Sequence, residues 1–99
     1  MRILSLPTLR AFYETPSYAD AKGPLLIWHA HTQKARWLGP ADVKTDFAGA
    51  SILKAGRVVF NIAGNKYRLV TSINYPYGIV FVKFIGTHKQ YDAIDAQTI

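Results

Sequence analysis

The residues best suited to chemistry lie on three short segments of alternating polar and apolar residues between Arg57 and Ile85. Such alternation, bounded by turn formers, is typical of antiparallel strands and predicts strands at Arg57–Ile62, Lys66–Ile73 and Ile79–Ile85. If the more apolar faces of these strands pack on helices, one outward face carries five polar side chains: Arg57, Asn61, Lys66, Arg68 and Lys83. Four cations and an amide suit a ligand that carries phosphate.

His88 and Tyr91 follow the last predicted strand and would stand beside this basic face. Each of these residues also has a structural use. The cations could form a solvated sheet face, His88 could bond a backbone carbonyl, and Tyr91 could pack in the core or at its rim. The residue types alone leave both interpretations open.

The assignment of faces rests on the two-residue period of a strand. Val58, Phe60 and Ile62 share the core face of the first strand with no polar residue among them. On the third strand the same rule assigns Phe84 to the core side, with Val80 and Val82. The rule assigns Ile85 to the other side, with Ile79, Phe81 and Lys83. A β-bulge would change part of this assignment.

The sequence does not indicate a metal site or a cofactor. His29 and His31 are two residues apart on a predicted helix and would point to nearly opposite sides, while His88 is far along the chain. Cysteine is absent, and the six acidic residues are scattered rather than paired. Asp92 and Asp95 are better explained as caps or ion-pair partners than as catalytic groups.

The remaining chain predicts helices that cover the sheet. Arg2–Leu4 reads as an opening strand that joins the sheet, and apolar spacing from Leu6 predicts a helix that Pro16 ends. Ser17 with Asp20 resembles a capping box that restarts a helix, which Gly23-Pro24 should kink or break before it resumes from Pro24 to about Trp37. Later predicted elements are a short helix or turn at 40–47, a short helix at 88–95 capped by Thr87, and a disordered tail at 96–99.

This order of elements predicts an α+β fold, in which a helical hairpin and the other helices lie on one face of the sheet. Trp28 and Trp37 are expected to pack between the helices and the sheet. With 99 residues, the chain is expected to form a single domain over 1–99.

Composition narrows the range of partners. The formal net charge of +6 and the pI near 9.8 favour a polyanion such as nucleic acid, or an acidic protein. The apolar runs are too short for a secretory signal or a transmembrane helix, so we expect a cytoplasmic protein. The absence of cysteine is compatible with a reducing compartment.

Taken in order, a set of residues across most of the chain resembles the HigB family of bacterial type II toxin–antitoxin toxins, a branch of the RelE/ParE-like superfamily. The resemblance is strongest in Arg57–Ile62 and Gly64–Leu69. It also includes Trp28, Ala35-Arg36-Trp37, Pro40–Lys44, Phe47, Asn74-Tyr75, Phe81–His88 and Tyr91-Asp92. The resemblance implies a RelE/ParE-like fold, in which an N-terminal strand and a helical hairpin pack on a mainly antiparallel sheet with a short C-terminal helix.

The resemblance further implies an mRNA interferase, which cleaves mRNA in the 30S A site of the ribosome. The partner would be a HigA-like antitoxin with a helix-turn-helix domain, and DNA would be reached only through that antitoxin. An acidic antitoxin segment could lie over the basic face or wedge onto the helical hairpin. In RNA cleavage of this kind the ribose 2′-OH attacks the adjacent phosphate, so no metal is needed.

Roles for individual residues follow from that implied chemistry. Arg68 is the first choice to hold the phosphorane, because a guanidinium matches phosphate oxygens bidentately. Lys66 is a second cation, and a base if its neighbours depress its pKa. His88 is the natural acid or base near neutral pH, and Tyr91 could stack on a base, orient the ribose or donate a proton. Arg57, Asn61, Asn65 and Lys83 are the candidate RNA-binding residues.

Two other function classes stay open. A toxin of the same fold could act on a protein target such as DNA gyrase, as the ParE branch does. A non-catalytic RNA-binding or ribosome-associated module could use the same basic face only to hold phosphates.

Overall fold

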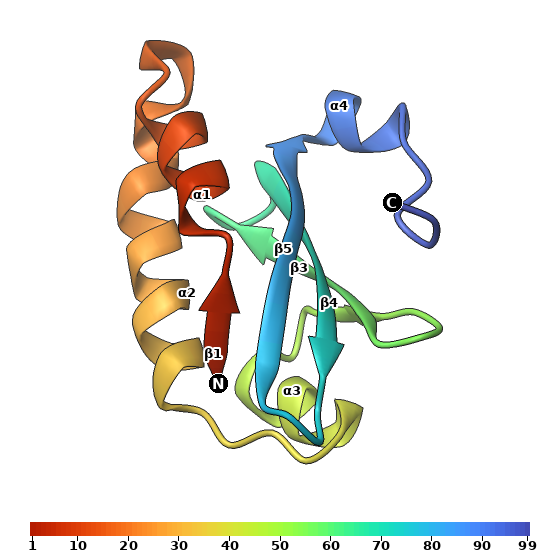
Figure 1. The fold of residues 1–99 in the computed structure, drawn as a ribbon. Helices are drawn as coiled ribbons and strands as arrows, with labels where there is room; N and C mark the ends of the chain where they lie inside the picture. Colours follow the sequence, from red (N-terminus) through yellow and green to blue (C-terminus); the bar gives the residue numbers. More distant parts are fainter.

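The computed structural model describes residues 1–99 and contains one five-stranded sheet with helices on both faces (Figure 1). The strands are β1 (Arg2–Leu4), β2 (Ser51–Ile52), β3 (Arg57–Ile62), β4 (Tyr67–Asn74) and β5 (Ile79–Thr87). The α-helices are α1 (Leu6–Tyr13), α2 (Lys22–Lys34), α3 (Pro40–Asp46) and α4 (His88–Asp92), and a 3₁₀ helix, η1, spans Pro16–Ala21. None of the helices has the length and apolar character that crossing a bilayer requires.

The sheet has the order β1-β5-β4-β3-β2 and is antiparallel except for β1, which runs parallel to β5. The predicted opening strand therefore does join the sheet. β3 has the predicted bounds, β4 begins one residue later than predicted, and β5 continues two residues further, to Thr87. The α+β fold predicted from the alternation is confirmed.

The main core lies between the sheet and the helical layer of α1, α2 and α3. Val58, Phe60 and Ile62 face this layer from β3, as predicted. Trp28 on α2 and Trp37 after it are 2% and 3% exposed, and both rings lie near Phe60, with centroids 5.4 Å and 6.2 Å away. The predicted packing role of the two tryptophans is confirmed.

The N-terminal helices differ from the prediction in two places. Ser17 and Asp20 do not form a capping box, because Pro16 itself begins η1 and Asp20 binds elsewhere. Gly23-Pro24 does not break α2, because Pro24 is the third residue of that helix. A first-turn N–H has no intrahelical acceptor in any case, so proline costs no hydrogen bond there. α2 ends at Lys34, where the backbone of Ala35 turns extended, and not near Trp37.

A β-bulge in β5 changes the predicted faces of its second half. Val70 pairs with Phe84 and Thr71 with Val82, so Lys83 has no partner on β4. The extra residue reverses the alternation beyond it: Ile85 turns into the main core and Phe84 turns to the opposite face. The predicted placement of these two side chains was wrong for this reason.

The second face of the sheet is covered by α4 and the residues that follow it, so the helices do not all lie on one face. Val59 and Val70 form a small core there with Phe84, Tyr91, Ile94 and Ala96. The tail at 96–99, predicted to be disordered, is held against the β2–β3 turn. The side chain of Gln97 donates to the carbonyl of Lys54 at 2.7 Å and accepts from its N–H at 2.8 Å.

Candidate active site

The centre of the candidate site is the guanidinium of Arg68, on the face of the sheet that α4 partly covers. The register of β3 and β4 pairs Asn61 with Arg68, so both side chains stand on the same face. Arg68 Nη1 donates to Asn61 Oδ1 and, at 2.5 Å, to Oδ1 of Asn65 in the β3–β4 turn. Two neutral amide oxygens therefore orient the guanidinium, and its remaining N–H groups are left for a ligand.

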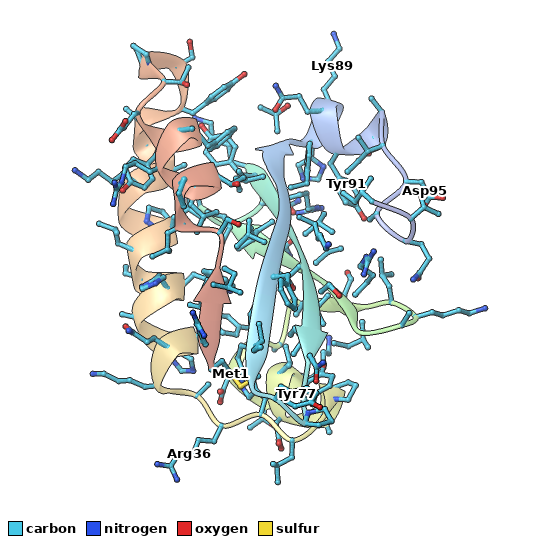
Figure 2. The ribbon with its side chains drawn as sticks, in the orientation of Figure 1. Met1, Arg36, Tyr77, Lys89, Tyr91 and Asp95 are labelled. Atoms are coloured by element: carbon cyan, nitrogen blue, oxygen red, sulfur yellow. The ribbon has the colours of Figure 1, made fainter.

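Tyr91 completes this cluster from α4. Its ring centroid lies 6.0 Å from Cζ of Arg68, within cation–π distance. Figure 2 shows Tyr91 between α4 and the sheet. His88 is the first residue of α4, two residues after Gly86, which is the register partner of Arg68. The end of β5 thus brings His88 and Tyr91 to the Arg68 end of β4, as the sequence predicted.

Local sequence explains why α4 starts where it does. Thr87 caps the helix through a capping box: its hydroxyl accepts from the N–H of Gln90, and Gln90 Oε1 accepts from the N–H of Thr87 at 2.9 Å. Gly86 leaves room for this arrangement, since a Cβ there would lie 2.6 Å from the Phe84 ring and 2.7 Å from Gln90 Oε1. The predicted cap at Thr87 is confirmed.

Lys66 has a different environment from Arg68. Its ammonium is paired with Asp20 of η1, whose other carboxylate oxygen accepts from the hydroxyl of Tyr67 at 2.5 Å. The hydrogen bond to Asp20 raises the pKa of Lys66, and the bonds from Lys66 and Tyr67 lower the pKa of Asp20. Burial, followed by the bond to Asp20, raises the pKa of Tyr67. The depressed pKa that a base at Lys66 would need is not found.

Two further predicted residues lie apart from Arg68. The guanidinium of Arg57, half-buried at the other end of β3, donates to the main-chain oxygen of Ile99. Lys83 is the exposed bulge residue of β5, and its ammonium lies 5.8 Å from the ring centroid of Phe81. Only part of the predicted polar face is therefore gathered at one point: Asn61, Asn65, Arg68 and Tyr91. His88 begins the helix that carries Tyr91.

The family of the chain is shown by its match to a family model. Residues 21–94, well over half of the chain, match the model described as HigB toxin, the RelE-like toxic component of a toxin–antitoxin system. The chain belongs to the HigB toxin family. A search of the curated proteins found no match. Membership of this family implies an antitoxin as the partner of the toxin.

The sequence did not predict that Asp20 of this toxin would pair with Lys66 near the site. It lies 46 residues before Lys66, and the capping-box pattern of Ser17 and Asp20 gave it another explanation. Gln90 was missed as well: besides its role in the cap, its side chain donates to the hydroxyl of Tyr18 at 3.3 Å and so links α4 to η1. No periodic signal connects such distant residues.

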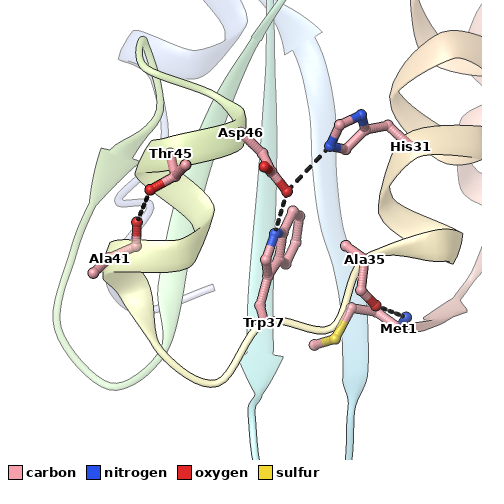
Figure 3. Close-up of polar contacts among 7 residues, drawn as sticks. All are labelled: Met1, His31, Ala35, Trp37, Ala41, Thr45 and Asp46. Atoms are coloured by element: carbon pink, nitrogen blue, oxygen red, sulfur yellow. Dashed lines mark hydrogen bonds and ion pairs between the residues drawn. The ribbon is translucent and has the colours of Figure 1, made fainter.

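A second carboxylate of the toxin, Asp46, joins helices α2 and α3 away from the candidate site. Asp46 Oδ2 accepts from Trp37 Nε1 at 2.8 Å and lies 3.1 Å from His31 Nε2 (Figure 3). These contacts, that of Trp37 first, lower the pKa of Asp46. The same figure shows the amino group of Met1 donating to the carbonyl of Ala35 at 2.7 Å. His31 thus serves to join α2 to α3.

Proposed function

We propose that this toxin is an mRNA interferase, an endoribonuclease that cleaves mRNA by metal-independent attack of a ribose 2′-OH. The observation that carries the proposal is the environment of Arg68. Asp20 contacts Lys66 and Asp46 contacts His31, and no carboxylate lies within ion-pair distance of Arg68. A guanidinium that is oriented by amide oxygens but keeps its full charge is suited to bind a phosphate.

The proposed reaction breaks one bond and forms another at the same phosphorus. The 2′-oxygen attacks the adjacent phosphorus as its proton passes to a base, and the 5′-oxygen leaves as it takes a proton from an acid. The products are a 2′,3′-cyclic phosphate and a 5′-OH end. The pentavalent intermediate carries more negative charge on its non-bridging oxygens than the substrate does, so a fixed cation beside them accelerates the reaction.

Each residue of the cluster has a place in this proposal. Arg68 holds the non-bridging oxygens of the phosphorane, and Asn61 and Asn65 keep its guanidinium in position. His88 exchanges the proton with the 2′- or 5′-oxygen, because an imidazole can both donate and accept a proton. Tyr91 contacts the guanidinium through its ring, which could also stack on a base. Lys83 and Arg57 contribute positive charge at longer range, whereas Asp20 neutralises most of the charge of Lys66.

The proposal extends to the partners of the toxin. We infer that the substrate is mRNA in the A site of the translating ribosome and that the neutralising partner is a HigA-like antitoxin with a helix-turn-helix domain. The net charge of +6 supports a polyanionic substrate and an antitoxin that contributes acidic residues.

The experiment that tests the proposal is mapping of 5′ ends in cellular mRNA after brief induction of the toxin. Wild type is compared with Arg68→Ala and His88→Ala. We expect new ends in coding sequences, in frame with codons, that appear with wild type and vanish with both variants. Lys34→Ala, an exposed substitution at the end of α2, is a control that should cut like wild type.

Growth arrest without new RNA ends would contradict the nuclease, and DNA gyrase would then be the first protein target to examine. Cuts that persist at full rate in Arg68→Ala would leave the nuclease standing but remove Arg68 from its site. RNA binding without cleavage would favour the non-catalytic module.

A further inference from the structure

Part of the second face of the sheet has no cover beyond the small core that α4 and the tail form there. On β4 that core ends at Val70. Further along the strands, Ser72 and Phe81 are register partners, and the two-residue period places both on the face of Val70, because Val82 points into the main core. Figure 1 shows α4 at one end of β4 and β5 and the turn between these strands at the other end. The surface around Ser72 and Phe81, toward that turn, is called the open face below.

The open face continues the positive charge of the candidate active site. None of the six acidic residues of the chain lies in a strand. Four cations do: Arg2, Arg57, Arg68 and Lys83. Arg2 reaches the open face because β1 lies next to β5 and the neighbouring Ile3 packs on the main core. No side-chain carboxylate lies within ion-pair distance of Arg2 or Lys83, so both keep their charge for a ligand.

An exposed aromatic ring stands on the open face beside a hollow. Phe81 is 37% exposed, and the ammonium of Lys83 lies 5.8 Å from its ring centroid. With Ser72 and Asn74, the ring lines a hollow of about 410 Å³ between the β2–β3 turn and the β4–β5 turn. This volume falls within the range for small-molecule pockets, about 300–1,000 Å³. A ring with a cation and a hollow beside it suits a planar base and its phosphate better than an acidic peptide.

The open face lies too far from Arg68 to serve the same nucleotide, but a path connects the two. From Arg68 to Ser72 the strand advances four residues, about 13 Å at the usual rise. The tail leaves the β5 side of this face clear, because it reaches the β2–β3 turn at Lys54 and Arg57. An RNA strand held at Arg68 can therefore continue along β5 without meeting an acidic residue on either strand.

We propose that the open face binds the RNA strand beyond the cut. One base stacks on Phe81 in the hollow, and Lys83 and Arg2 bind phosphates on either side of it. The contact is independent of base identity, because every base has a face that stacks. The inference rests on the proposed RNA cleavage and adds a second RNA contact, which holds the substrate without touching the bond that breaks.

The first test compares Phe81→Thr with Ile52→Thr. Ile52 is 38% exposed and pairs with Val58 of the main core, so it is a strand residue of matched exposure that faces away from the open face. The readout is the affinity, by fluorescence anisotropy, for a labelled RNA hexamer whose 2′-oxygens are all methylated and cannot attack. We expect Phe81→Thr to weaken binding about tenfold, within the range for one stacked base. Ile52→Thr should bind like wild type, and Phe81→Trp, which keeps a ring, should bind at least as tightly.

A second test identifies the stacked base. Each base of the hexamer is removed in turn. One removal should weaken binding to wild type about tenfold and have no further effect on Phe81→Thr, whereas removals elsewhere should affect both proteins alike. Lys83→Ala should instead weaken binding of every hexamer and reduce the salt dependence by about one ion.

A third measurement needs no variant, so it decides the matter even if Phe81→Thr does not fold. Titration of the wild-type toxin with the hexamer should shift the amide NMR signals of Ser72, Phe81 and Lys83. Inorganic phosphate should shift mainly the Arg68 side-chain signals.

The outcomes separate this inference from the proposed function. If Phe81→Thr binds the hexamer as tightly as Ile52→Thr, or the signals of the open face do not move, the second RNA contact is wrong and the nuclease stands. The open face would then fit an acidic segment of the antitoxin. If the stacked base is found in a toxin that cleaves no RNA, the contact stands and the proposed nuclease fails.

Discussion

Lys66 and Arg68 stand two residues apart on either side of the buried Tyr67, yet they have opposite electrostatic environments. Arg68 is held by the amide oxygens of Asn61 and Asn65 and lies beside the ring of Tyr91. Lys66 is held by the carboxylate of Asp20. The first cation is oriented and keeps its charge for a ligand, whereas the second has an internal counter-ion.

The difference shows that counting cations on a strand overstates the charge available to a substrate. An amide oxygen accepts a hydrogen bond without adding a charge, so the field of Arg68 still reaches a phosphate. A carboxylate cancels most of the field beyond its partner, and a phosphate would have to compete with it. We therefore assign the larger part in the proposed cleavage to Arg68, and each experiment below tests that contrast.

The largest expected effect is on the rate of RNA cleavage. We expect Arg68→Ala to lower the rate about 10²- to 10³-fold, the cost of removing one donor that stabilises a developing oxyanion. Lys66→Ala should lower it less than about tenfold, because Asp20 already neutralises that ammonium. The measurement is single-turnover cleavage of a short RNA, on ribosomes if free RNA is not cut.

Arg68→Lys provides the matched control for charge without bidentate geometry, and its rate should fall between those of wild type and Arg68→Ala. Circular dichroism should show that all three variants remain folded. Equal losses of rate for Lys66→Ala and Arg68→Ala would contradict the contrast, because the two cations would then contribute equally to cleavage.

A second effect concerns the contact between α4 and the sheet. In Gly86→Ala the new methyl would collide with the Phe84 ring and with Gln90 Oε1. Overpacking of this kind costs about 1–3 kcal/mol, and it should also move Tyr91 away from Arg68. Urea denaturation should show the loss of stability, and cleavage should fall with it.

Gly23→Ala in α2 is the control for that substitution, because nothing lies within 4 Å of a Cβ there. Alanine in a helix should raise stability by about 0.5–1 kcal/mol relative to glycine. A Gly86→Ala toxin as stable as wild type would mean that α4 adapts without cost, and would weaken the argument that this glycine positions Tyr91.

A smaller effect is expected at Tyr91 itself. Tyr91→Ala removes the half-buried ring beside the guanidinium, a cation–π contact worth about 0.5–1 kcal/mol where it is not fully desolvated, so cleavage should fall about two- to fivefold. Tyr91→Phe keeps the ring and should stay close to the wild-type rate. If Tyr91→Phe falls as far as or further than Tyr91→Ala, the hydroxyl takes part in proton transfer.

The sequence was informative wherever a short-range pattern determines the structure. Alternation predicted β3 and placed Asn61 and Arg68 on one face, because strand pairing preserves a two-residue period. Thr87 was recognised as a helix cap because a capping box is contained within four residues. These two local features account for most of the candidate site.

The contacts that the sequence could not supply join distant residues or interrupt a period. The bulge at Lys83 has no residue signature here, yet it reverses the faces of Phe84 and Ile85. Asp20 looked like part of a cap, and only the packing of η1 against the end of β4 brings it to Lys66. The tail was predicted to be disordered because the β2–β3 turn, to which Gln97 is hydrogen-bonded, is far away in the sequence.

The smallest expected effect is the pH dependence of stability conferred by the Lys66–Asp20 pair. The hydrogen bonds from Lys66 and Tyr67 lower the pKa of Asp20 below its ordinary value of 3.8, so this contribution is present above about pH 4 and is lost as the pH falls through the folded-state pKa. The pKa of Lys66 is raised above 10.5, so its contribution is present below that pH and is lost as the pH rises further.

Asp20→Asn keeps the shape of the side chain but replaces one of the two acceptor oxygens with an NH2 group, so it removes the charge and one of the two hydrogen bonds, from Lys66 or from Tyr67. The wild-type Tm should exceed that of Asp20→Asn between about pH 4 and 10, and the difference should shrink on either side of that range. Arg68→Gln, which alters the cation without a carboxylate partner, should show no such dependence on pH. A Tm difference for Asp20→Asn that stays the same below about pH 4 and above about pH 10 would mean that Asp20 acts as a neutral acceptor, and Lys66 would then be as available to phosphate as Arg68.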